Sequence, residues 1–164
     1  MPEDTAPPPK AFVNYDGFYA PIKSRGLHED TLRKYNVKIS ADGKHVQFPY
    51  YSSNGRLVAY KKRSQNKEFS WVGKNEDQQL FGQHLFGGGK TLVVCEGELD
   101  CCATWQARPN WPCVSVPNGA KGAKKALTAQ LKWLQRFDEV ILMFDNDAAG
   151  IEASEECAYL FGYD

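Results

Sequence analysis

The second half of the chain alternates short apolar segments with segments of helical spacing. Three apolar runs favour β-strands: Thr91–Cys95, Pro112–Val116 and Val140–Phe144. Helical spacing follows each run in turn: Leu99–Ala107, Lys124–Phe137 and about Ala148–Leu160. Strands that alternate with helices form a parallel sheet, because a crossover must return the chain to the same edge before the next strand begins. The sequence therefore predicts a βαβαβα unit with short buried strands.

The first half predicts a small antiparallel sheet instead. Two strand-like runs, His45–Tyr51 and Arg56–Arg63, flank a turn that contains Asn54-Gly55. Both residues of this pair tolerate positive φ, which the favoured hairpin turns require. Phe69–Val72 is expected to extend the sheet, and residues 24–36 have the spacing of a short amphipathic helix.

We therefore expect an α/β chain with three parts. Four prolines within the first nine residues predict a flexible leader over residues 1–14. An α+β N-terminal lobe with the antiparallel sheet and a basic β-hairpin is expected over residues 15–80. A parallel-sheet, Rossmann-like domain is expected over residues 81–164.

Composition narrows the class of protein. Hydrophobic residues make up 42% of the chain and aromatic residues 13%, which is enough to bury a core and argues against general disorder. No apolar run approaches the roughly 20 residues that span a bilayer. The acidic, proline-rich N-terminus is unlike a secretory signal. We expect an intracellular protein that is not secreted and has no membrane segment.

The cysteines and histidines do not form the pattern of a zinc site or of a disulfide framework. The five cysteines are odd in number, show no C-x-x-C spacing and lie far in sequence from the three histidines. Zinc is therefore not expected. Cys95 and Cys113 belong to apolar runs and are expected to be small core residues.

Charge is divided unevenly between the two halves. Residues 1–90 carry 14 Lys and Arg against 9 Asp and Glu, whereas residues 91–164 carry 6 against 11, from totals of 20 and 20. A basic half that holds phosphates and an acidic half that holds metal would suit an enzyme acting on nucleotides. Ordinary charge fluctuation is the alternative.

Carboxylates stand directly after two of the predicted parallel strands. Glu96 follows the first strand, and Asp145 and Asp147 follow the third. Ligands of open α/β sheets bind beyond the carboxyl ends of the strands, so these side chains are expected to converge. Magnesium takes one or two protein carboxylates together with water and substrate phosphates, which predicts a Mg²⁺ or Mn²⁺ site. The alternative for the D-x-D pair is a turn whose aspartate caps the next helix.

Two further acids lie near Glu96. Glu96 is a candidate both for metal binding and for proton exchange with a reacting hydroxyl. Asp100 lies four residues later and is expected on the same side of the starting helix. Glu98 is expected to be an exposed acid of the first helical turn, where the helix dipole favours negative charge.

The basic residues of the first half cluster around the second hairpin strand. Strand alternation places Lys61 and Arg63 on one face, and Lys67 follows shortly after. These cations are candidates for binding nucleotide or template phosphates. A solvated edge strand protected by lysines is the alternative. Four nearby aromatic residues are expected in the core of this lobe rather than as base-stacking platforms: Phe48, Tyr50, Tyr51 and Tyr60.

Two segments that contain the candidate carboxylates resemble the signature of the TOPRIM domain, which primases, topoisomerases and some nucleases share. They are EGELD, after the first parallel strand, and ILMFDNDAAG, around the third. The wider context resembles the primase half of the primase–helicase proteins of short-tailed phages and of their mitochondrial helicase relatives. The segments that carry this resemblance span roughly residues 24–161 and include SRGLHEDTLRKY, NGRLVAYKKR, NKEF, LFGQHLFGGGKTLVVCEGELD and CVSVPNGAKGAKK.

The resemblance assigns roles to individual residues. Glu96 matches the TOPRIM glutamate, Asp145 and Asp147 match the metal-binding D-x-D pair, and Asp100 matches a further acidic position of primases. The basic segment associated with nucleotide and template phosphates is matched by Lys61, Arg63 and Lys67. The implied activity is that of a DNA primase, a nucleotidyltransferase that makes short RNA primers from ribonucleoside triphosphates on single-stranded DNA with Mg²⁺. A replicative helicase, fused or separate, is the implied partner, and the host cytoplasm is the implied location if the protein is viral.

Two other functions stay open. One is a non-catalytic TOPRIM module that binds single-stranded DNA within a replicative helicase, and the other is a different TOPRIM enzyme such as a nuclease. Family members carry another acidic position on a later strand, whereas this chain ends at Asp164. We therefore expect a parallel sheet that is truncated at its C-terminus and a metal site that is incomplete. The zinc-binding module and the helicase domain of the family are expected to be absent from this chain.

Overall fold

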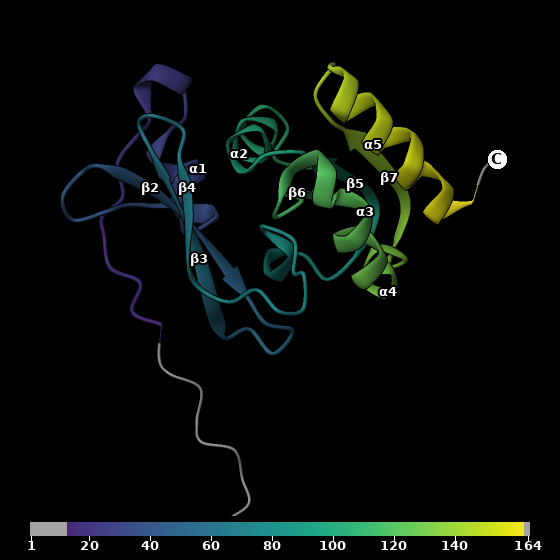
Figure 1. The fold of residues 1–164 in the computed structure, drawn as a ribbon, viewed down its shortest axis with the longest axis horizontal. Coiled ribbons are helices and arrows are strands. Elements are labelled where there is room, and N and C mark those ends of the chain that lie inside the picture. Colours follow the sequence, from purple (N-terminus) through teal and green to yellow (C-terminus); the bar gives the residue numbers. More distant parts are fainter. Residues whose placement is uncertain (1–12, 163–164) are drawn as a thin grey trace, which may run out of the picture.

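The computed structural model describes residues 13–162, so nearly all of the expected leader lies outside the described residues. Two lobes lie side by side (Figure 1). The N-terminal lobe holds a four-stranded antiparallel sheet in the order β1-β2-β3-β4. Its strands are β1 (Lys38–Ile39), β2 (His45–Tyr51), β3 (Leu57–Ser64) and β4 (Phe69–Gly73). The predicted antiparallel sheet is confirmed, with the short β1 as an addition.

The C-terminal lobe holds a three-stranded parallel sheet in the order β6-β5-β7. Its strands are β5 (Gly89–Cys95), β6 (Cys113–Ser115) and β7 (Phe137–Met143). The crossovers contain α2 (Glu98–Ala107), α3 (Gly119–Ala129) and α4 (Leu131–Leu134), and α5 (Ala148–Ala158) follows β7. The predicted α/β fold class, with an antiparallel sheet followed by a parallel one, is confirmed.

The hairpin follows from its turn chemistry. Gly55 has a φ of 83°, a left-handed conformation that glycine adopts without steric cost. The turn is closed by hydrogen bonds from Gly55 N to Ser52 O (2.9 Å) and from Ser52 N to Arg56 O (2.8 Å). In the resulting register Phe48 pairs with Lys61 and Tyr50 with Ala59.

The predicted helix over residues 24–36 is wrong in extent. The structure has a 3₁₀ turn at Lys23–Arg25 and a separate helix α1 (Glu29–Lys34). Gly26, at a φ of 64°, ends the first turn, and Leu27 then forms a bridge back to Ile22. The chain therefore makes a tight reversal before α1 begins.

The predicted helix over residues 124–137 is also wrong in its bounds. Helix α3 starts earlier, at Gly119, and ends at Ala129. The break after it is held by the Gln130 side chain, which donates to Asp77 O (2.7 Å) and accepts from Gln83 Nε2 (2.8 Å). Strand β7 then begins at Phe137, three residues before the expected strand.

The parallel sheet packs on both faces. Alternation along β5 sends Leu92 and Val94 into one core with α3 and α5, and Val93 and Cys95 into another core. This second core also contains α2 and residues of the N-terminal lobe, and Figure 1 shows α2 between the two sheets. Tyr35 illustrates the joint packing, because its ring stacks on Phe81 at 5.3 Å and its hydroxyl donates to Cys113 O at 2.7 Å.

The expectation of buried core residues is confirmed for the two cysteines and for two of the four aromatic residues. Cys95 and Cys113 are buried in the core shared by the lobes, as are Phe48 and Tyr50. Tyr51 and Tyr60 are only half-buried. Among residues 13–162, no helix is both long and apolar enough to cross a membrane.

Candidate active site

The acidic edge lies where two neighbouring parallel strands end. Strands β5 and β7 pair with Cys95 opposite Met143, so Glu96 and Asp145 leave the sheet at the same edge. The backbone N–H of Asp145 donates to Glu96 Oε1 at 3.3 Å. The predicted convergence of these two residues is confirmed. We use the term acidic edge for Glu96, Asp100, Asp145 and Asp147.

The pKa values of two carboxyl groups at the acidic edge are raised, in part by the like charges around them. The pKa of Glu96 is raised by partial burial, by a hydrogen bond with the Asp145 side chain and by the charges of Asp145 and Asp147. The pKa of Asp100 is raised by burial and by the charge of Asp145, while Arg25 and Arg63 oppose the shift. Carboxylates that repel one another disfavour joint ionisation, and a divalent cation between them would remove that cost.

The donor set fits a sparse magnesium site rather than a closed one. Within residues 13–162, no group of three or more His, Cys, Asp or Glu side chains is assembled to hold a metal ion by itself. Magnesium keeps several waters and completes its octahedron with one or two carboxylates and substrate phosphates. Glu96, Asp145 and Asp147 carry carboxylate oxygens, which are the atom type that magnesium prefers. Their role as metal ligands stays a prediction.

Asp147 also caps helix α5. Its Oδ1 accepts a hydrogen bond from Gly150 N at 2.7 Å, so the alternative interpretation of the D-x-D pair holds for this residue. A carboxylate offers two oxygens with several lone pairs, and one capping bond leaves capacity for a metal. The cap therefore orients Asp147 without excluding it as a ligand.

Gly150 fixes the path of the backbone around Asp145, and this role of the glycine was missed from the sequence. A Cβ at this position would lie 2.0 Å from the carbonyl oxygen of Asp145, closer than any side chain tolerates. The backbone of Asp145 therefore packs directly on the first turn of α5. Its place three residues after Asp147 was the available signal, since a glycine inside a helix is unfavourable without a packing reason.

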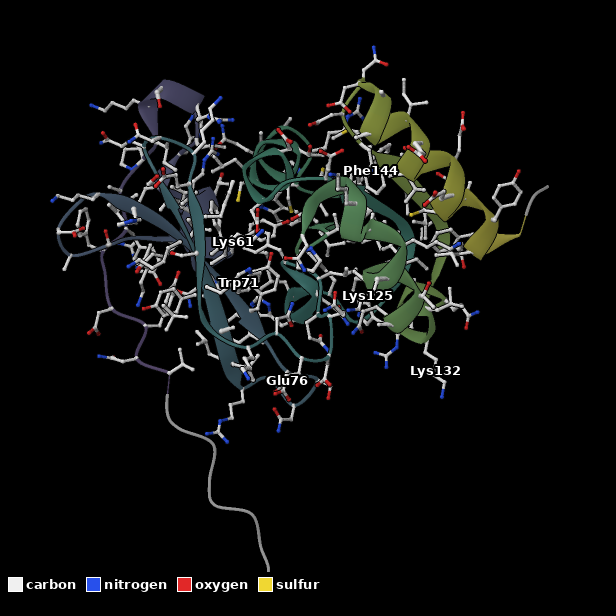
Figure 2. The ribbon with its side chains drawn as sticks, viewed as in Figure 1. Lys61, Trp71, Glu76, Lys125, Lys132 and Phe144 are labelled. Carbon is white, nitrogen blue, oxygen red and sulfur yellow. The ribbon has the colours of Figure 1, made fainter. Side chains whose placement is uncertain are left out.

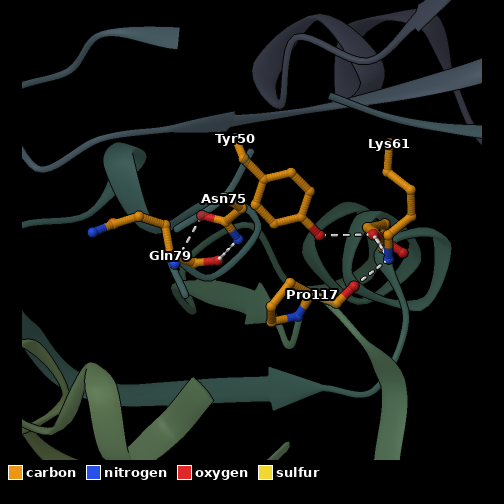
Figure 3. Close-up of polar contacts among 6 residues, drawn as sticks. Tyr50, Lys61, Asn75, Gln79 and Pro117 are labelled. Atoms are coloured by element: carbon orange, nitrogen blue, oxygen red, sulfur yellow. Dashed lines mark hydrogen bonds and ion pairs between the residues drawn. The ribbon is translucent and has the colours of Figure 1, made fainter. Parts of the chain in front are cut away.

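Glu98 is buried, and the expectation of an exposed acid is wrong. Only 5% of Glu98 and 7% of Lys61 are exposed. Lys61 Nζ lies 2.5 Å from Glu98 Oε2, and the Tyr50 hydroxyl donates to the same oxygen at 2.7 Å. Lys61 also donates to the carbonyl oxygen of Pro117, as the dashed lines in Figure 3 show. Glu98 does lie in the first turn of α2, as expected, but the N-terminal lobe packs over that turn.

The basic row faces the other lobe. Lys61 and Arg63 contact the same Phe69 ring at 5.4 and 5.8 Å, which confirms that they share a face. Figure 2 shows Lys61 and Trp71 between the antiparallel sheet and the C-terminal lobe. Strand β3 pairs with both β2 and β4, so the alternative of a protected edge strand is wrong. Whether Lys61, Arg63 and Lys67 bind phosphate stays a prediction.

Arg63 and Lys67 line an open pocket of about 420 Å³ that we call the basic pocket. Arg25 and Lys44 also line it, and Leu99 contributes the first turn of α2. Burial and the charge of Arg25 lower the pKa of Arg63, whereas Glu98 and Asp100 oppose the shift. Crowded cations next to an acidic edge are suited to an anion that also carries a metal, such as a triphosphate.

Replacing Gly150 by Ala should destabilise the chain. The new methyl group must displace the Asp145 backbone, and overpacking of this kind costs about 1–3 kcal/mol. At an ordinary position inside a helix, replacing Gly by Ala raises the free energy of unfolding. A decrease in this free energy would therefore indicate the close packing of Gly150 on the Asp145 backbone. Urea unfolding measures the effect, with Gly87→Ala as the control because no atom lies within 4 Å of its added Cβ. Equal stability of wild type and Gly150→Ala would contradict the proposed packing.

Magnesium should stabilise the folded chain through the acidic edge. At a concentration tenfold above its Kd, Mg²⁺ adds about 1.4 kcal/mol, or roughly 3–6 °C in Tm. The raised pKa values of Glu96 and Asp100 mean that the metal-free protein gains stability as pH falls through those values, because protonation removes the repulsion between the carboxylates. Protonated carboxyl groups no longer attract a cation. The stabilisation by Mg²⁺ should therefore be largest at neutral pH and shrink on acidification.

Thermal unfolding of the double variant Asp145→Asn/Asp147→Asn provides the test. Asparagine caps helices as well as aspartate, so this variant should fold yet show no Mg²⁺ shift. Asp138→Asn removes an exposed carboxylate from the opposite end of β7 and should keep the shift. An undiminished shift in the double variant would place the metal elsewhere.

Comparison with known proteins relates both lobes to primases. Residues 93–163 match the family described as Toprim-like, and residues 17–73 match the N-terminal α+β fold of the bacteriophage T7 DNA helicase/primase. The DNA helicase/primase of Enterobacteria phage T3 is 35% identical over 150 residues, which cover 90% of this chain and 26% of the phage protein. The chain thus spans about a quarter of that relative.

Two solved structures of phage T7 superpose closely on this one. The primase fragment of the primase-helicase protein matches with a TM-score of 0.86 at 34% sequence identity. The matched region covers 94% of this chain and 68% of the fragment. The second structure is a complex of the lagging-strand DNA polymerase with primase domains bound to an RNA/DNA hybrid and dTTP. It matches with a TM-score of 0.85 at 34% sequence identity, and the matched region covers 92% of this chain and 81% of the chain in the complex. The chain belongs to the primase family of the phage DNA helicase/primase proteins.

Proposed function

We propose that this chain is the catalytic domain of a DNA primase, which makes short RNA primers on single-stranded DNA during replication. One observation carries the proposal: the acidic edge and the basic pocket meet at the first turn of α2, where Asp100 is near Asp145 and Arg63. The relatives named as DNA helicase/primase and the T7 primase domains bound to an RNA/DNA hybrid and dTTP support it.

The proposal assigns roles to the residues of the two surfaces. Glu96, Asp145 and Asp147 hold Mg²⁺, for which Mn²⁺ can substitute. The proposed mechanism uses no zinc ion. A metal ion held there would neutralise phosphate charge and stabilise the charge that develops on the reacting oxygens. Arg63 and Lys67 hold the phosphates of the incoming nucleotide or of the template.

The reaction joins two nucleotides. The 3′-hydroxyl of one nucleotide attacks the α-phosphorus of a ribonucleoside triphosphate, a phosphodiester bond forms, and the bond to pyrophosphate breaks. Glu96 and Asp100 are the candidates to accept the proton that the hydroxyl loses. The fixed backbone at the acidic edge holds the reactants in line, because small displacements of reacting groups cost large factors in rate.

The relatives support a biological setting for this proposal. Single-stranded DNA and ribonucleoside triphosphates are the proposed substrates, and a replicative helicase, fused or separate, is the proposed partner. The proposed site of action is the inside of the cell, which for a phage protein is the host cytoplasm.

A non-catalytic module that binds single-stranded DNA is the second candidate. The observation that favours it is the lack, among the described residues, of a ready-made group of three metal ligands. Such a module would bind DNA without incorporating nucleotides.

Primer synthesis tests the proposal directly. Wild-type protein should incorporate labelled ribonucleotides on a single-stranded template in the presence of Mg²⁺ or Mn²⁺, and should not do so after chelation. Asp145→Asn/Asp147→Asn should lose at least 100-fold in rate, because the substrate triphosphate then lacks its metal. Template cleavage without incorporation would indicate a nuclease, and DNA binding without either reaction would favour the non-catalytic module.

The basic pocket should determine the salt dependence of DNA binding. Each lost contact to a single-strand phosphate reduces the slope of log K against log salt by about 0.7, so Arg63→Ala/Lys67→Ala should reduce it by about 1.4. Lys62→Ala is the matched control, since Lys62 lies on the opposite face of β3. A fluorescence titration at several salt concentrations measures the slopes. Identical slopes in all three proteins would leave the pocket without a phosphate-binding role.

A further inference from the structure

Lys61 and Glu98 join two surfaces that carry different parts of the proposed site. Glu98 lies in the first turn of α2, two residues after Glu96 and two before Asp100. Lys61 lies on β3, two residues before Arg63. Their 2.5 Å ion pair therefore links the backbone of the acidic edge to the backbone of the basic pocket.

Lys61 also reaches a second segment of the C-terminal lobe. Pro117, whose carbonyl oxygen accepts from Lys61, follows β6 and precedes α3. The chain leaves the ligand edge of the sheet after each of its three strands, and Lys61 contacts the first two of these segments. Figure 3 shows its side chain extending from β3 toward Pro117.

The Lys61 ammonium group is enclosed by protein. Beyond Glu98 and Pro117, it faces the rings of Phe69 and Trp71 at 5.4 and 5.3 Å. An ammonium has three N–H groups and accepts nothing, so these neighbours occupy most of its directions. A phosphate could reach Lys61 only after the buried ion pair had separated.

Stability alone does not account for such a pair. Desolvation of two buried charges offsets most of their attraction, and apolar residues of similar size are often as stabilising. The pair offers a fixed geometry instead, since both charges are held by hydrogen bonds that include Tyr50 and Pro117. A fixed distance between metal ligands and phosphate ligands is what phosphoryl transfer requires.

We propose that Lys61 and Glu98 form an interlobe strut that sets the position of the acidic edge relative to the basic pocket, and that Lys61 acts through Glu98 instead of binding substrate phosphate. Both are positioning residues. This inference rests on the proposed primase function for the reaction that the strut serves.

Three variants of the full chain separate positioning from phosphate binding. Lys61→Met leaves Glu98 buried without its counter-charge, and its Tm should fall by roughly 10 °C. Lys61→Met/Glu98→Gln removes both charges while the new amide still accepts from Tyr50, so most of that loss should be recovered. Arg63→Ala removes a cation of the basic pocket and serves as the reference.

The expected results differ between the salt dependence of DNA binding and the rate of primer synthesis. The salt slope for single-stranded DNA should equal that of wild type in Lys61→Met/Glu98→Gln and should fall by about 0.7 in Arg63→Ala. The kcat of primer synthesis should fall at least tenfold in the double variant, with KM for the nucleotide changed less than about threefold, because positioning and not binding is lost.

Two results would overturn the proposal. A slope in the double variant that falls as in Arg63→Ala would show that Lys61 binds phosphate, and an unchanged kcat would show that the pair only fills space. Glu98→Asp provides the test should the double variant fold poorly, since it keeps the charge, shortens the strut by one methylene and should lower kcat with an unchanged slope. A wild-type protein that binds DNA but makes no primer would overturn the proposed function, while the slopes would still decide the role of Lys61.

Discussion

One hydrophobic core shared by the two lobes holds the candidate site together. Tyr35 of the N-terminal lobe stacks on Phe81 and hydrogen-bonds to Cys113, and Leu99 of α2 packs into the same cluster. The first turn of α2 therefore cannot move without disturbing the core of the other lobe. Close packing of this kind transmits displacement instead of absorbing it, so the acidic edge and the basic pocket behave as one rigid arrangement.

The carboxylates of the edge could be found from the sequence because their placement follows from local rules. A short apolar run ends, the sheet is parallel, and the next residues emerge at the ligand edge. The start of β7 was misplaced because Asp138 and Glu139 are exposed and interrupt the apolar run at Phe137. This error left the site unaffected, since only the end of the strand decides where Asp145 emerges.

The role of Glu98 could not be found in this way, because its partners come from the other lobe. The pattern around Glu98 describes only its own helix, whereas Lys61 and Tyr50 reach it from β3 and β2. The sequence identified Lys61 as one cation among several, with nothing to distinguish a buried position from an exposed one. Local periodicity predicts which face of an element is apolar, but it does not predict which charge the neighbouring lobe will cover.

The segment from Asp145 to Gly150, which ends in the first turn of α5, shows how the fold resists the repulsion between the carboxylates of the site. Burial and neighbouring charges raise the pKa of Glu96 and Asp100, so the arrangement is electrostatically unfavourable at neutral pH. The capping bond of Asp147 and the contact of Gly150 with the Asp145 backbone hold the carboxylates in place nonetheless. An acidic edge that is already organised needs little rearrangement when a cation and its phosphates bind. Folding has brought the carboxylates together against their repulsion, and binding of a cation relieves that repulsion, which favours binding.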